Sequence, residues 1–377
     1  MRRSIAALAA CLTLATACGG GSSDEGTDLP DDETEAEVSD ADTGDQVEND
    51  DASIDTGTTA PVEIAEGPKA PFTGLAADDE LLAQPAIMVK ISNNDDRSLE
   101  ALIGIEFADI VIEERIEDRA TRFAAIYHSD IPDLVGPVRS ARTTDLDLLT
   151  NLGTPMLVFS GANLNVLGDL RELALAGGVV LVVDDGSGDY HFRDGDYRAP
   201  DNLFIDLTKV RGDFGGDAGV PAPILEYRTA ESDTRPASID GSGFTVTGRD
   251  TVSFVFDPSR GYVRVQDGAV HVTREGQPVV VSNVVVMETR YVPNTADAQS
   301  VDAITVGEGA VSVLIGGRRF EGSWSRADSS SGYEFRTEAG EMIVLEPGTT
   351  WITLVPAGTY EFGVDTAAQG LVLGGDE

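Results

Sequence analysis

A sharp change in composition near residue 69 sets how much of this chain can fold. Between Asp24 and Glu66 the sequence has 17 acidic residues and no lysine or arginine. So charged a segment has too little apolar surface to offset its loss of chain entropy, and we predict an extended, disordered tether over residues 18–68. Whether this tether binds Ca²⁺ or a partner is left open by the sequence. From Lys69 onward the composition is globular, and about 300 residues remain, enough for two domains.

The first residues carry the features of a bacterial export signal. Arg2 and Arg3 precede an apolar run that is shorter than the roughly 20 residues of a membrane-spanning helix. The run ends at Cys18, which follows small residues and precedes three glycines. We therefore predict a signal peptide over residues 1–17 and acyl chains such as palmitate on Cys18, which hold the lipoprotein at the extracytoplasmic face of the cell membrane. The alternative is ordinary signal cleavage, with Cys18 incidental.

Cysteine content and charge exclude several classes of chemistry. Cys11 and Cys18 are the only cysteines, and Cys11 leaves with the predicted signal, so we expect neither an internal disulfide nor cysteine catalysis. A net charge of −40 repels phosphate backbones, so no nucleic-acid partner is predicted. Without a Gly-rich phosphate loop or a zinc-ligand pattern, we predict no metal and no cofactor. The oligomeric state stays open.

Hydrophobic patterns predict an α+β fold. Apolar and alternating runs indicate strands in the first half, separated by runs with helical spacing, and this order is typical of an α/β sheet domain over residues 69–215. Short strand patterns separated by turn residues predict a smaller β-rich domain over residues 241–360. The predicted strands of the first domain are 85–92, 108–116, 121–130, 155–163 and 179–185, and its predicted helices are 143–153, 164–178 and 203–212.

Arginines supply the candidate chemistry. The stretch "GPVRSAR" places Arg139 and Arg142 at a junction between strand and helix, where backbone N–H groups and the helix dipole attract anions. Guanidinium groups bind phosphate or carboxylate with two hydrogen bonds and keep their charge. We predict a ligand site at Arg122, Arg139 and Arg142. Arg193 and Arg198, which flank "DGDY", are expected to close over the same cleft.

Motifs spread over residues 70–357 follow the order of a known family. They are "PFTGL", "ADIVIEERIEDRATRFAAIYHSD", "VGPVRSAR" and "FRDGDYRAPDNLF", then "NVVVMETRY", "GSWSR" and "LEPGTTWITLVP". In these motifs the chain resembles the YerB-like lipoproteins of Gram-positive bacteria, a two-part domain of unknown function. The resemblance implies export, lipidation and two domains, and no established reaction. Where members commonly have an "EGGITR"-like turn this chain has "IEDRATR", and where many have His it has Asp201.

Three functions stay open from the sequence. The first is binding of an anionic cell-envelope ligand or partner by the predicted arginine site. The second is an enzyme: the chain loosely resembles the LytR-CpsA-Psr phosphotransferases, which implies that the three arginines hold a polyprenyl pyrophosphate and that Asp145 orients a metal. The third is a structural or interaction lipoprotein whose arginines pair with Glu113, Glu114 or Asp145. A hydrolase triad of Ser140 and His128 is disfavoured, because no G-x-S-x-G motif is present.

Overall fold

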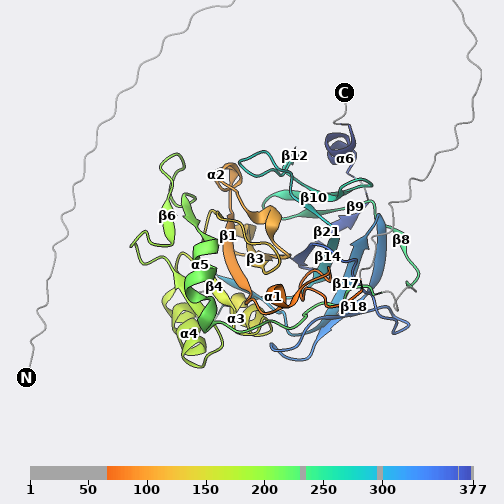
Figure 1. Cartoon of the computed structure of the whole chain (residues 1–377). Coiled ribbons are helices and arrows are strands. Elements are labelled where there is room, and N and C mark those ends of the chain that lie inside the picture. The colour runs from red at the N-terminus through yellow and green to blue at the C-terminus, as the bar shows by residue number, and fades with distance from the viewer. Residues whose placement is uncertain (1–65, 230–234, 295–299, 364, 375–377) are drawn as a thin grey trace, which may run out of the picture. The chain divides into compact units, whose positions relative to one another are not determined.

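One mixed sheet of eleven strands runs through the part of the chain that the computed structural model describes, residues 66–229, 235–294, 300–363 and 365–374 (Figure 1). Its strands are β1 (Ile87–Asn93), β2 (Ile110–Arg115), β3 (Thr121–Tyr127), β4 (Met156–Phe159), β5 (Val180–Val183), β8 (Ile239–Asp240), β14 (Asn283–Glu288), β17 (Gly307–Ile315), β18 (Arg318–Arg326), β19 (Glu334–Arg336) and β20 (Thr350–Val355). Their order is β19-β18-β17-β14-β20-β2-β3-β1-β4-β5, and β8 pairs with β18. We call this the central sheet.

Both faces of the central sheet are buried, which explains why its strands are apolar almost throughout. On one face Met88 of β1 joins a core with Leu148 and Leu149 of α3 (Thr144–Leu149) and residues of α4 (Leu164–Leu175). On the other face Ile87 and Val89 of the same strand join a second core. Because side chains alternate along a strand, neighbouring residues of β1 serve opposite cores.

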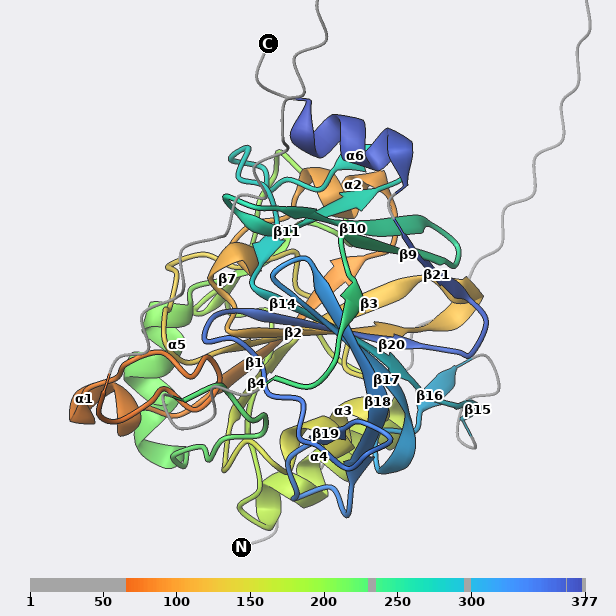
Figure 2. The ribbon, with the colours of Figure 1, turned by 90° about the vertical axis from the view of Figure 1, so that its right-hand side faces the viewer.

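A second sheet covers the face of the central sheet opposite α3 and α4 (Figure 2). It has the order β12-β11-β10-β9-β21, with β13 paired to β11. Its strands are β9 (Gly243–Thr247), β10 (Thr251–Asp257), β11 (Gly261–Gln266), β12 (Ala269–Val270), β13 (Val280–Val281) and β21 (Tyr360–Phe362). Helix α6 (Thr366–Leu373) packs Ala368 and Val372 against the outer face of this sheet.

The remaining elements lie in the connections. The helices are α1 (Asp79–Leu82), α2 (Asp96–Glu100) and α5 (Leu207–Phe214), with 3₁₀ turns at Ile105–Phe107, Glu117–Arg119 and Gly215–Asp217. The strands β6 (His191–Arg193) and β7 (Leu203–Ile205) form one two-stranded sheet, and β15 (Tyr291–Pro293) and β16 (Val301–Ala303) form another. Among the described residues no helix is both long and apolar enough to cross a membrane.

The predicted α+β fold class is confirmed, with a mixed sheet and helices in the N-terminal part and a β-rich C-terminal part. Strands from both parts belong to the central sheet: β20 lies between β2 and β14 and is parallel to both. The division into domains at 69–215 and 241–360 stays a prediction. The predicted signal over 1–17 and Cys18 lie outside the described residues, as does the tether over 18–68 except for its last three positions.

Candidate functional site

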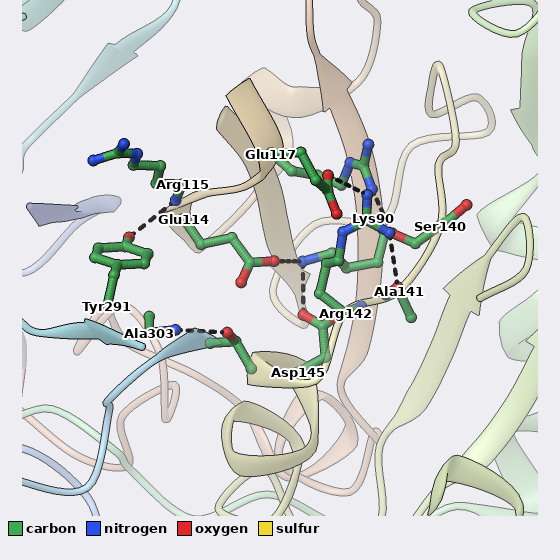
Figure 3. Close-up of polar contacts among 12 residues, drawn as sticks. Lys90, Glu114, Arg115, Glu117, Ser140, Ala141, Arg142, Asp145, Tyr291 and Ala303 are labelled. Atoms are coloured by element: carbon green, nitrogen blue, oxygen red, sulfur yellow. Dashed lines mark hydrogen bonds and ion pairs between the residues drawn. The ribbon is translucent and has the colours of Figure 1, made fainter. Parts of the chain in front are cut away.

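A buried ion-paired lysine lies on the face of the central sheet that α3 covers (Figure 3). Lys90 of β1 is fully buried, and its Nζ lies 2.6 Å from Glu114 Oε1 and 2.6 Å from Asp145 Oδ1. The second oxygen of Asp145 accepts the backbone N–H of Arg142 at 2.7 Å. Burial raises the pKa of Asp145, and the charge of Lys90 opposes that rise. Both oxygens of Asp145 therefore have partners inside the fold, which the metal-binding role in the transferase hypothesis does not require.

The structure brings three predicted site residues together beside this lysine. Arg122 of β3 is 2% exposed, whereas the side chains of Arg139 and Arg142 are 20% and 18% exposed. Burial, together with the nearby charges of Arg142 and Arg139, lowers the pKa of Arg122 to about 9. We call these three residues the arginine cluster. It has a buried end at Arg122 and two members that reach solvent.

The members of the arginine cluster differ in their partners. Nη2 of Arg142 lies 2.7 Å from Glu117 Oε2, an ion pair. Nε of Arg139 lies 3.8 Å from Asp201 Oδ1, which is too long for a hydrogen bond. Nη1 of Arg122 donates to the carbonyl oxygen of Ser140 at 3.0 Å. Among the described residues no carboxylate lies within 4.0 Å of Arg122, and its buried Nε has no hydrogen-bond partner.

The two other predicted site residues lie apart from the arginine cluster. Arg193 on β6 is 52% exposed, pairs with Asp184 at 3.3 Å and donates to Asn202 at 2.9 Å. Arg198 is exposed, and its carbonyl oxygen accepts the backbone N–H of Asp201. The loop between β6 and β7 therefore reaches the site through Asp201 instead of through either guanidinium group. Asp201 is held there by Ser92, whose hydroxyl donates to it at 2.6 Å.

Residues 72–218 match the N-terminal domain, and residues 244–352 the C-terminal domain, of a family described as "Protein of unknown function (DUF3048)". The chain belongs to this family. It is 26% identical over 306 residues to a Bacillus subtilis protein named "Putative lipoprotein YerB", covering 78% of this chain and 88% of that protein. A crystal structure of YerB from Bacillus subtilis has the same fold, with a TM-score of 0.67 at 22% identity, covering 79% of this chain and all of that one.

The turn over Glu117–Arg119 has an unusual backbone conformation beside the arginine cluster. Asp118 and Arg119 both have left-handed backbone angles, with φ of 56° and 61°, which glycine adopts at less cost. The turn holds Glu117, which accepts a hydrogen bond from the Ser300 hydroxyl at 2.6 Å besides its ion pair with Arg142. Backbone strain of this kind is common at functional sites.

A second buried polar cluster lies on the opposite face of the central sheet, and nothing in the sequence pattern predicted it. Arg264 of β11 is fully buried, and its Nη2 lies 2.9 Å from Glu113 Oε1. Oε2 of Glu113 accepts the indole N–H of Trp351 at 3.0 Å, and Oε1 also accepts the Thr121 hydroxyl at 2.8 Å. His271 lies 2.6 Å from Arg264 Nη1. We call this the Glu113 cluster; it joins strands of both sheets.

The carboxylates proposed as partners in the structural hypothesis are engaged elsewhere. Glu114 and Asp145 pair with Lys90, and Glu113 pairs with Arg264, so none of the three forms an ion pair with the arginine cluster. In the described part of the chain, Glu117 and Asp201 are the carboxylates within 4.0 Å of the cluster. The turn "IEDRATR" and Asp201 were singled out in the sequence, but their contact with the cluster was not predicted.

Ser140 and His128 do not form a catalytic pair. The carbonyl of Ser140 contacts Arg122 at the start of β3, whereas His128 follows the end of that strand. The His128 ring is buried against Phe72, and its Nε2 lies 3.1 Å from the carbonyl oxygen of Gln84. His128 is therefore an interior residue with a contact to the backbone.

His128→Gln is expected to reduce the acid sensitivity of folding. Burial, and secondarily the charge of Arg211, lower the pKa of His128 from 6.5 to about 4. Below pH 6.5 the imidazole of His128 is protonated in the unfolded chain, whereas in the folded chain it stays neutral down to about pH 4. The stability that the neutral ring contributes to the fold is therefore complete above pH 6.5 and is lost as the pH falls through about 4. Urea unfolding near pH 7 and near pH 4.5 measures it. The stability of the wild type relative to the variant should fall at the lower pH, and an unchanged difference would contradict the assignment.

Proposed function

We propose that the arginine cluster binds a phosphate or carboxylate group of a cell-envelope ligand. The observation that carries this proposal is the buried Arg122, which lacks a carboxylate partner. The chain satisfies other buried arginines differently: Arg264 pairs with Glu113, and Arg326, 1% exposed, donates to carbonyl oxygens at 2.8 and 3.0 Å. Arg122 has one hydrogen bond, to a carbonyl, among the described residues.

A bound oxyanion would supply what the arginine cluster lacks. Burying a cation without a counter-charge is unfavourable, and hydrogen bonds to charged groups contribute more than neutral ones. An anion that enters between the partly exposed Arg139 and Arg142 would meet three cationic groups and accept hydrogen bonds from N–H groups that the fold leaves without a partner. Arginine forks bind phosphate and carboxylate oxygens in this way.

We further propose that the protein is a lipoprotein anchored through Cys18, with residues 18–68 as a spacer between membrane and folded body. This is supported by the predicted signal sequence and by the name of the relative in Bacillus subtilis. Attachment at the extracytoplasmic face would present the arginine cluster to anionic wall polymers and lipid-linked precursors. A transferase reaction on such precursors has less support, because Asp145 is engaged by Lys90 and by the Arg142 backbone.

Arg122→Gln is expected to abolish anion binding without unfolding the protein. At about 100 times its dissociation constant, a ligand stabilises the fold by roughly 2.7 kcal/mol, which raises the melting temperature by several degrees. Pyrophosphate, a polyprenyl phosphate and soluble wall fragments are the probes. The wild type should show this rise with at least one of them, and Arg122→Gln should not. Without ligand the variant should melt no earlier than the wild type, because the fold loses an uncompensated buried charge.

Arg326→Gln is the matched control, since it also removes a buried guanidinium group. It should melt early, because its carbonyl partners lose their donor, yet keep the ligand-induced rise. An Arg122→Gln variant that melts early and binds every probe as the wild type does would make Arg122 a structural residue and refute the proposal.

A further inference from the structure

A separate pocket of about 220 Å³ lies between the ends of the two large sheets. Its apolar wall consists of Val246 and Val252 from the second sheet and Leu354, Val355 and Pro356 at the end of β20. Other lining residues are Glu113, Thr121 and Thr353 of the central sheet. Glu113 and Glu114 are neighbours on β2 and point to opposite faces, so this pocket and the arginine cluster lie on different faces of the central sheet.

Three arginines line this pocket without a carboxylate partner. They are Arg115 at the end of β2, Arg119 in the following turn and Arg249 in the connection between β9 and β10. The last two are held together by their backbones, since Arg249 N–H donates to Arg119 O at 3.3 Å. Within the described part of the chain, no carboxylate lies within 4.0 Å of these three guanidinium groups. In a protein with a net charge of −40, such a group of unpaired cations points to an anionic ligand.

Two carboxylates line the pocket, and within the described part of the chain neither forms an ion pair with these three arginines. Glu113 is engaged by Arg264, Trp351 and Thr121 inside the Glu113 cluster. Asp250 lines the pocket next to Arg249; burial raises the pKa of its carboxyl group, and the charge of Arg249 opposes that rise. The arginines are half-buried or exposed at the opening, whereas Glu113 is buried at the inner side. An anionic group at the opening therefore meets arginines first.

The inner side of the pocket has an unused hydrogen-bonding group. Thr353 is 3% exposed, and its buried Oγ has no hydrogen-bond partner among the described residues. An unsatisfied buried hydroxyl is uncommon in folded proteins, because its desolvation is not compensated. Thr353 lines the pocket next to Glu113, its register partner on β2. A ligand with a polar group beside its apolar part would satisfy this hydroxyl.

We infer that the pocket binds the C-terminal residue of a peptide or a free acylated amino acid with an apolar side chain. The carboxylate faces Arg119 and Arg249, the side chain packs on the apolar wall, and the amide pairs with the Thr353 hydroxyl. The volume suits this class, because a cavity of about 150 Å³ already binds a benzene ring and this pocket is larger. This site is independent of the function proposed for the arginine cluster.

Titration calorimetry on the full chain tests the three contacts separately. N-acetylleucine supplies carboxylate, amide and side chain; hexanoate lacks the amide, and N-acetylleucinamide lacks the charge. We expect N-acetylleucine to bind most tightly of the three. Arg119→Gln/Arg249→Gln should weaken its binding about tenfold, the loss expected for hydrogen bonds to a charged group. A tripeptide that ends in leucine distinguishes a peptide terminus from a free acyl amino acid.

Thr353→Val tests the inner contact with little change of shape. It should weaken N-acetylleucine about tenfold and leave hexanoate unchanged, because only the former pairs with the hydroxyl. The matched control Arg171→Gln alters an exposed arginine on α4 and should bind as the wild type does. The inference is overturned if N-acetylleucine does not bind, or if it binds equally to the wild type and both variants. It is also overturned if Arg139→Gln/Arg142→Gln abolishes its binding, which would place the ligand in the arginine cluster.

Discussion

Lys90→Met is expected to lower the free energy of unfolding by about 3–5 kcal/mol, the usual cost of removing one partner from a buried ion pair. Lys90 is the shared partner of Glu114 and Asp145, each at 2.6 Å and each buried. Methionine fills a similar volume, so the loss reports mainly on the two carboxylates that remain without a counter-charge. Urea unfolding at neutral pH, followed by circular dichroism, measures it.

Two variants separate this electrostatic effect from a packing effect. Lys90→Met/Glu114→Gln/Asp145→Asn removes all three charges and should recover much of the stability, because neutral side chains do not require a counter-ion. Arg171→Gln changes an exposed residue of α4 and should alter the free energy of unfolding by no more than about 0.5 kcal/mol. If the single and triple variants of Lys90 are equally unstable, packing instead of charge accounts for the role of Lys90.

The strands were predictable because burial on both faces makes their sequences apolar. The run predicted at 85–92 corresponds to β1, and that at 108–116 contains β2. The helix predicted over 203–212 was partly wrong: residues 203–205 form β7, and α5 begins only after Asp206. Asp206 is the N-cap, and its side chain accepts the backbone N–H of Lys209 at 2.8 Å. This capping aspartate was the signal in the sequence that separates strand from helix.

The candidate site was predictable only where its parts are local. Arg139 and Arg142 share one short stretch, so their proximity follows from the sequence. Their carboxylate neighbours come from the turn at Glu117 and the loop at Asp201, and only the tertiary fold brings these segments together. The two carboxylate partners of Lys90 could not be predicted either, since a lysine within an apolar strand does not indicate which carboxylates surround it in the fold.

The topology of the central sheet was not predictable from local pattern. β20 pairs with β2 across more than two hundred residues of sequence, and parallel neighbours need no short connection. Sequence periodicity reports which residues are buried, but not which strand lies beside which. The family segments at 72–218 and 244–352 are separate blocks in the sequence, yet their strands form the two halves of one sheet, which meet where β20 pairs with β2.

This shared sheet leads to the second large prediction: neither half of the chain should fold alone. Without β20, β2 loses its parallel neighbour, and Glu113 loses both Trp351 and Arg264. An edge strand with a buried, unpaired carboxylate is unfavourable on both counts. Separately expressed fragments 66–229 and 235–374 should each lack a cooperative unfolding transition, which means the loss of the whole folding free energy, about 5–15 kcal/mol for a typical protein.

The full chain should correspondingly unfold in one step. Fluorescence of Trp324 and Trp351 reports on the C-terminal part, whereas helical circular dichroism reports mainly on α3, α4 and α5 of the N-terminal part. Coincident urea transitions by both probes are expected, because the two cores lie on opposite faces of the same sheet and cannot separate without breaking it. Two separated transitions, or a cooperative fragment 66–229, would instead establish 69–215 as an autonomous domain. The contacts between β2 and β20 would then be an interface between domains, and the Glu113 cluster would stabilise their association instead of the fold of either one.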